Sequence, residues 1–182
     1  PPGADLDRLL QNLGLAQEST LTLAGLCLFG RYPQRFKPAF LIKAVRFSGT
    51  EVTGTSYSDS EDFGGRLDEQ FRGALSFVMR NLPKRQNGQS VNSQGVPAVA
   101  REVWEELLAN ALVHRNYFLS APIRILYFDD RVEITSPGAL PNHLTVEKVR
   151  RGLSSFRNPT LGSFAAAGLL VYRGLGTGLR RA

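Results

Sequence analysis

The sequence predicts an α+β fold in which helices pack on one face of a mixed β-sheet. Residues 67–82 place apolar side chains at helical spacing, whereas residues 39–47 and 123–128 are short apolar runs rich in β-branched residues, typical of strands. A length of 182 residues allows one substantial core or two small ones, and 42% hydrophobic with 21% charged residues is ordinary for a globular protein.

The first half of the chain is expected to contain three helices and one strand. The expected elements, in order, are a helix at 5–13 with four leucines on one face, a helix through Phe29 capped by Ser19 and Thr20, a strand at 39–47, a polar loop at 48–62 and an amphipathic helix at 67–82 stopped by Pro83. We expect residues 1–83 to form an N-terminal α+β segment that packs onto the same core as the second half.

The second half begins after a polar linker or loop at 84–95. The expected elements are a long helix at 96–114 started by Pro97, paired strands at 123–128 and 132–135 around an Asp129-Asp130 turn, a short helix capped by Thr145, and a helix from Asn158-Pro159 to Leu170. Residues 96–182 are predicted to form one module.

The charge distribution favours a phosphate-containing partner. The formal net charge is +6, and the stretch from Glu147 to the end holds seven basic residues and one acid, which is the whole excess. Such a segment suits a nucleotide or nucleic acid, although a solvated basic surface remains the alternative.

The lone Cys27 excludes a disulfide within the chain and fits a reducing compartment, and the longest apolar run, 21–29, is too short to span a bilayer. We therefore expect a soluble cytoplasmic protein without membrane contact.

Glu106 and Asn110 are four residues apart on the long predicted helix and so share one face. A carboxylate can activate a water molecule, and a neighbouring amide oxygen can ligate Mg²⁺, a hard cation that takes its other ligands from phosphate and water. The alternative is a pair of polar residues on a solvated face. His114 lies at the end of this helix, and we expect it to be structural rather than catalytic.

Two glycine-containing turns add to this pattern. Ser136-Pro137-Gly138 ends a predicted strand, where a glycine lets a planar base approach the backbone; a plain turn is the alternative. The stretch from Gly174 to Gly178 has closely spaced glycines whose amide groups can surround phosphate oxygens; a flexible chain end is the alternative.

The order of these elements resembles the GHKL (Bergerat) ATP-binding fold of gyrase, Hsp90, histidine kinases and MutL. The closer resemblance is to the C-terminal module of RecG-like "ATP-dependent DNA helicase" or transcriptional regulator proteins, in which a Schlafen-type AlbA-like domain precedes the module and a winged helix often follows. The segments that carry it are Leu21–Leu26, Leu28–Gly30, Asn110–Tyr117, Asp130–Gly138, Arg157-Asn158-Pro159 and Gly174–Gly178.

The resemblance implies a two-layer GHKL-like sandwich with a nucleotide pocket. In it, Glu106 would be the water-activating base and Asn110 the Mg²⁺ ligand through the nucleotide. The other implied contacts with Mg-ATP are Ser136 and Gly138 near the base, Arg157 and Asn158 in a mobile lid, and Gly174, Gly176, Thr177 and Gly178 around the phosphates.

Ser136 departs from the GHKL pattern, which reads adenine with an aspartate at this position. Losing the charged acceptor costs on the order of 1.5–3 kcal/mol, or about 10- to 150-fold in affinity, enough to turn a micromolar site into one of tens to hundreds of micromolar.

We expect a fragment of a bacterial transcriptional regulator or RecG-like protein with an ATP-binding-like module, a weak ATPase at most. DNA would be bound through domains missing from this fragment, and a homodimer is expected because GHKL relatives commonly dimerise. One alternative is a scaffold or dimerisation module that no longer binds ATP; another is direct DNA binding through the basic C-terminal segment. A helicase motor is excluded for these residues because no G-x-x-x-x-G-K-[ST] motif is present.

Overall fold

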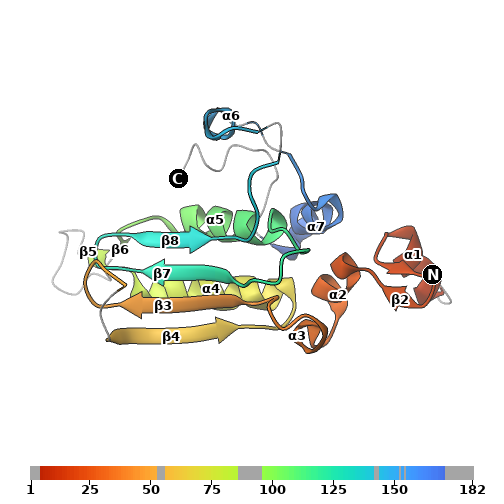
Figure 1. The fold of residues 1–182 in the computed structure, drawn as a ribbon, viewed down its shortest axis with the longest axis horizontal. Coiled ribbons are helices and arrows are strands. Elements are labelled where there is room, and N and C mark those ends of the chain that lie inside the picture. Colours follow the sequence, from red (N-terminus) through yellow and green to blue (C-terminus); the bar gives the residue numbers. More distant parts are fainter. Residues whose placement is uncertain are drawn as a thin grey trace.

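The computed structural model describes residues 5–52, 56–85, 96–141, 144–151, 153 and 155–170. Its centre is a four-stranded sheet in the order β4–β3–β7–β8, with two long helices behind it (Figure 1). The strands are β3 (Ile42–Phe47), β4 (Tyr57–Phe63), β7 (Ile123–Tyr127) and β8 (Val132–Thr135), and the helices are α4 (Leu67–Asn81) and α5 (Arg101–Val113). Because β3 and β7 are parallel and the other neighbours antiparallel, the sheet is mixed, and the predicted fold class is confirmed.

One face of the sheet carries the core and the other faces solvent. Ile42 pairs with Ile123 and Ala44 with Ile125, and all four side chains are buried. Their neighbours in sequence alternate to the opposite face, where Arg124 is exposed. On the buried side, residues such as Phe71 and Val78 of α4 and Leu108 and Leu112 of α5 complete the core.

The chain before the sheet forms a small unit that projects from one end of it (Figure 1). It consists of α1 (Leu6–Asn12), the hairpin strands β1 (Ala16–Gln17) and β2 (Thr20–Leu21), α2 (Leu23–Phe29) and α3 (Pro33–Phe36). The predicted caps Ser19 and Thr20 are wrong, because Thr20 pairs with Gln17 in the hairpin. The cap is Thr22, whose hydroxyl accepts from the Gly25 amide at 3.1 Å.

Two more boundaries differ from the prediction. The expected polar loop at 48–62 contains β4, an edge strand whose charges lie opposite those of α4: Arg80 contacts Asp59 at 2.9 Å and Glu61 at 2.6 Å. The helix expected from residue 96 begins at Arg101, because the two-residue strand β6 (Val96–Pro97) pairs with β5 (Lys84–Arg85). The rest of the expected linker, 86–95, lies outside the described residues.

The C-terminal part leaves the sheet after β8. It contains α6 (Val146–Arg150), which stands apart from the sheet, and α7 (Pro159–Phe164), which is followed by one π-helical turn at Ala165–Leu169 (Figure 1). Thr145 caps α6 through the Lys148 amide, as predicted. Within the described part of the chain, no helix is long and apolar enough to cross a membrane.

Candidate functional site

The face of α5 that turns away from the buried core carries Glu106 and Asn110, both half-buried. The Asn110 side-chain amide donates to Glu106 Oε1 at 3.0 Å. This bond orients the side-chain amide, and Asn110 Oδ1 accepts no hydrogen bond from the described residues. An amide oxygen held in this way is the atom that a hard cation takes as a ligand.

One turn further along α5, His114 contacts the segment 155–158, which we call the lid segment. The His114 ring stacks on Phe156 with centroids 5.7 Å apart and an interplanar angle of 19°. Burial lowers the pKa of His114, and the charge of Arg157 acts in the same direction, whereas a hydrogen bond with the Ser155 backbone and the charge of Glu106 oppose the shift. His114, with its pKa below 6.5, therefore joins α5 to the lid segment by stacking on Phe156 and by its hydrogen bond with the Ser155 backbone.

Asn158 fastens the lid segment to the C-terminal end of α5. Its side-chain amide donates to the carbonyls of Val113 and Arg115, both at 2.7 Å. The side chain therefore does not cap α7, although Asn158 is its N-cap residue. Arg157 extends the attachment by donating to the carbonyl of Ala139 in the loop after β8.

Ser136 has a structural contact of its own. Its hydroxyl donates to the Ala111 carbonyl at 2.7 Å, so its proton is used and its lone pairs remain free to accept. The exocyclic amine of adenine is a donor and needs an acceptor. The Ser136 hydroxyl oxygen can accept such a hydrogen bond, as an aspartate can, but it carries no negative charge.

Gly138 is required by its own loop. Its φ is +113°, and a Cβ atom there would lie 2.8 Å from Asn116 Cβ. The loop is held against Asn116 by a backbone hydrogen bond: the Asn116 backbone N–H donates to the Pro137 carbonyl at 2.7 Å. The sequence predicted that a planar base approaches the backbone at Gly138; in the structure it is Asn116 that lies against this glycine.

Six of the predicted site residues lie on three segments that meet around the C-terminal half of α5. They are Glu106 and Asn110 on α5, Ser136 and Gly138 after β8, and Arg157 and Asn158 in the lid segment. Gly174, Gly176, Thr177 and Gly178 lie outside the described residues.

The sequence reasoning missed Tyr117, which is buried and donates from its hydroxyl to the Leu112 carbonyl at 2.9 Å. It also missed the contact between His114 and Phe156. The resemblance already pointed to Asn110–Tyr117. Phe156 is too distant from His114 in sequence to be found from spacing, and the bond from Tyr117 to Leu112 forms across the end of α5, where helical spacing no longer applies.

Comparison with known proteins bears on the C-terminal third of the chain. Residues 120–182 match the family model described as "Putative ATP-dependent DNA helicase recG C-terminal". This stretch is therefore similar to the C-terminal module of RecG-like proteins, a module of the GHKL-like ATPase type. The resemblance inferred from the sequence is confirmed for this stretch, which includes β7, β8 and the lid segment, whereas Glu106 and Asn110 precede it.

The fold is also similar to the crystal structure of the DIP2311 protein from Corynebacterium diphtheriae, with a TM-score of 0.68 and 22% sequence identity. The match covers 98% of this chain and 35% of that one, so the chain spans about a third of that protein's length. At this identity the likeness shows the fold alone. No curated protein matches the sequence.

Proposed function

We propose that the RecG C-terminal module, together with α5, binds Mg-ATP and serves as a nucleotide-responsive part of a longer RecG-like regulator. The observation that carries the proposal is the oriented pair on α5: Asn110 Oδ1, which accepts no hydrogen bond from the described residues, lies beside the Glu106 carboxylate, on the face that ends at the lid segment. In this proposal the lid segment closes over the nucleotide.

The donor set fits the group. Mg²⁺ takes few protein ligands and accepts oxygen atoms, so Asn110 Oδ1 would hold it together with the phosphates. Ser136 would accept from the exocyclic amine of adenine while its proton stays on the Ala111 carbonyl. Replacing a charged by a neutral acceptor weakens that one contact by about 1 kcal/mol, or roughly fivefold, which is less than its complete loss.

Glu106 is placed to act on water near that site. One of its oxygens accepts from Asn110, and the other is left to take a proton. When bound, Mg-ATP supplies the phosphoryl group and its electrophilic phosphorus. We propose slow hydrolysis with Glu106 as the base.

A second candidate function is a scaffold that keeps the fold without the ligand. It is favoured by the same Ser136 contact, because a hydroxyl that stabilises the end of α5 has a structural reason to be present. In this case dimerisation or contact with neighbouring domains would be the role of the module.

Calorimetric titration with Mg-ATP separates the two candidates. Heat at millimolar ligand or below in the wild type, weakened about tenfold or more by Asn110→Ala only while Mg²⁺ is present, is the result we expect. Asn12→Ala, which removes the same side chain from an exposed position on α1, is the matched control and should bind like the wild type. If Mg-ATP produces neither heat nor a rise in the melting temperature of the wild type, nucleotide binding is excluded and the scaffold function remains.

A further inference from the structure

The turn that leads into β3 displays aromatic and basic side chains together. Arg31, Tyr32, Arg35, Phe36 and Lys37 are all exposed, and we call these five residues the α3 surface. The Tyr32 and Phe36 residues are 62% and 69% exposed, although burying either ring would be favourable. The α3 surface therefore combines two exposed aromatic rings with three basic side chains at a single turn.

The α3 surface is positively charged. Between Glu18 and Glu51 the sequence has five basic residues and no acid. Two of the five are neutralised by ion pairs, Lys43 with Asp62 at 2.6 Å and Arg46 with Asp129 at 2.7 Å. The remaining three are those of the α3 surface, and no carboxylate among the described residues pairs with them.

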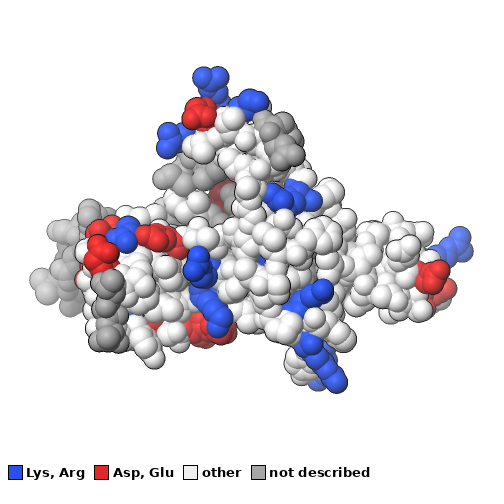
Figure 2. All heavy atoms as spheres, in the orientation of Figure 1, with Lys and Arg blue, Asp and Glu red and all other residues white. Residues whose placement is uncertain are grey.

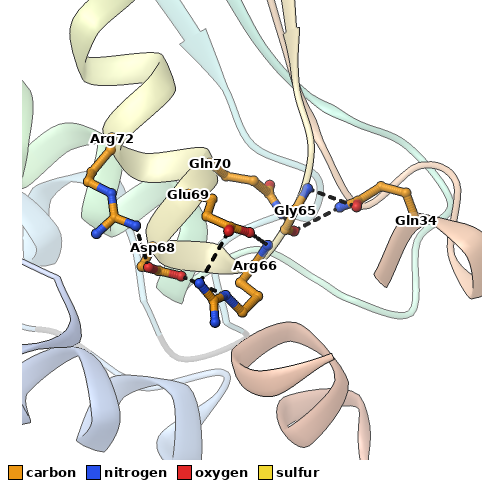
Figure 3. A network of polar contacts seen from close by, with 7 residues as sticks. All are labelled: Gln34, Gly65, Arg66, Asp68, Glu69, Gln70 and Arg72. Atoms are coloured by element: carbon orange, nitrogen blue, oxygen red, sulfur yellow. Dashed lines mark hydrogen bonds and ion pairs between the residues drawn. The ribbon is translucent and has the colours of Figure 1, made fainter. Parts of the chain in front are cut away.

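The backbone under this surface is fixed to the core (Figure 3). Gln34 accepts from the Gly65 amide at 2.9 Å and donates to the carbonyls of Gly65 and Phe40. Gln70 donates to the same two carbonyls at 2.9 and 3.1 Å. Because Pro33 is buried as well, the turn is anchored by its inward residues and presents the others in a fixed arrangement.

The polar residues next to this anchor are charge-balanced. Figure 3 shows Arg66 and Arg72 with Asp68 and Glu69, in a network that includes an Arg72–Asp68 contact of 2.6 Å and an Arg66–Glu69 contact of 3.2 Å. Two cations and two carboxylates leave no net charge. In this part of the molecule the unbalanced positive charge therefore lies on the α3 surface, and Figure 2 shows basic side chains gathered where α3 lies in Figure 1. Arg72 provides a control for it.

We propose that the α3 surface binds single-stranded nucleic acid. The three cations would contact backbone phosphates, and Tyr32 and Phe36 would stack against unpaired bases. Arg31 already lies over the Tyr32 ring, 5.4 Å from its centroid, so charge and ring are presented together. In a duplex the base faces are covered by their neighbours, so two exposed rings favour a single strand. The α3 surface shares no residue with the candidate nucleotide site around the C-terminal half of α5, so the two proposals are independent. In Figure 1, α3 lies at the β4 edge of the sheet, whereas α7, which follows the lid segment, lies nearer β8.

Fluorescence anisotropy with a labelled oligothymidylate tests the proposal on the intact chain. Each stacked ring contributes enough that Tyr32→Ala and Phe36→Ala should each weaken binding roughly five- to 100-fold. Arg35→Gln should lower the slope of log affinity against log salt by about 0.7, the value for one phosphate contact on a single strand. Arg72→Gln removes the same charge from the balanced network and should leave the slope unchanged.

All of the substituted side chains are exposed, so circular dichroism should show unchanged folding. Ring-dependent binding that prefers the single strand over a duplex of the same sequence would support the proposal. It would be overturned by variants that bind like the wild type, by a preference for duplex, or by binding to phosphatidylserine vesicles without binding to the oligonucleotide. Binding lost through substitutions in α6 alone would place the surface there instead and equally overturn it.

Discussion

Replacing Arg115 by lysine should destabilise the protein more than any other exchange of arginine for lysine in the described sheet and helices. Arg115 is 1% exposed and donates to the carbonyls of Ala121 at 2.6 Å, Ala39 at 3.1 Å and Leu119 at 3.4 Å. Its guanidinium also lies over the rings of Phe40 and Tyr117, with centroid distances of 4.6 and 5.1 Å. Burial lowers the pKa of Arg115 from 12.5. A guanidinium nevertheless stays protonated in proteins at neutral pH.

The expected loss follows from these contacts. A lysine ammonium is a point charge and cannot span carbonyls that precede two different strands, so at least one charge-assisted hydrogen bond is lost, worth about 1.5–3 kcal/mol. Weakening one ring contact costs a further 0.5 kcal/mol or so. We expect Arg115→Lys to lower the free energy of unfolding by about 2–3.5 kcal/mol, a large part of an ordinary domain's stability.

Urea unfolding followed by the fluorescence of Trp104, the only tryptophan, measures this change. With a typical urea slope of about 2 kcal/mol per molar, the midpoint should fall by roughly 1–1.7 M at unchanged slope. Arg124→Lys is the matched control, because Arg124 is exposed on β7 and its exchange should stay within about 0.5 kcal/mol. Equal midpoints for the two variants would refute the idea that the buried hydrogen bonds of Arg115 stabilise the fold.

Other predictions concern the core thiol and the lid segment. Cys27 is 3% exposed and burial raises its pKa to about 12, so a thiol reagent should modify it only as fast as the protein opens; rapid modification of the folded protein would contradict this. Burial holds the pKa of His114 below 6.5, so the unfolded chain binds the proton more readily and stability should fall as the pH drops through 6.5 towards the lower folded value. His114→Gln should remove this dependence from the unfolding midpoint. Asn158→Ala removes two hydrogen bonds and should cost about 2 kcal/mol or release the lid segment, seen as faster amide exchange at 155–158; Ser163→Ala, at an exposed position on α7, is the control and should change neither.

The elements predicted well are those whose signal is local. Helix α4 has its apolar residues on one face, and the pair β7–β8 has two short apolar runs around a two-residue turn. The cap of α6 by Thr145 needs only a residue three positions away. In each case the deciding interactions lie within about one turn or one hairpin of sequence.

The elements predicted wrongly depend on distant partners. Strand β4 is polar at nearly every position, and it forms because its backbone pairs with β3 and its acids meet Arg80. The start of α5 is moved to Arg101 because Val96 and Pro97 pair with a strand that precedes the expected linker. Helix α3 was missed because Pro33 and Gly30 indicate an end of structure, and the anchor that holds the turn comes from Gly65 and Gln70.

The candidate site shows the same division. Glu106 and Asn110 share a face because they are four residues apart on a helix, and this separation is read directly from the sequence. The contacts of Ser136 with Ala111 and of Asn158 with Val113 join residues 25 and 45 positions apart, and no periodicity reports them. The residue types were predicted, but their use as structural donors was not.

These donors share a target, which links the fold to the site. The last four carbonyls of a helix have no partner within it. In α5 they accept from the His114 amide, the Ser136 hydroxyl, the Tyr117 hydroxyl and the Asn158 amide, which come from the helix cap, the end of β8, the following loop and the lid segment.

An aspartate at position 136 could not take part in this arrangement, because an ionised carboxylate has no proton to donate to the Ala111 carbonyl and would be repelled by it. Serine at that position is therefore consistent with a helix end that is closed by donors, and it still offers lone pairs on the side away from Ala111. The departure from the GHKL aspartate is thus a change in how α5 is held as well as a change in how adenine would be read. Through the bonds of Asn158 to the Val113 and Arg115 carbonyls, the lid segment is attached to the same helix that carries Asn110 and Glu106.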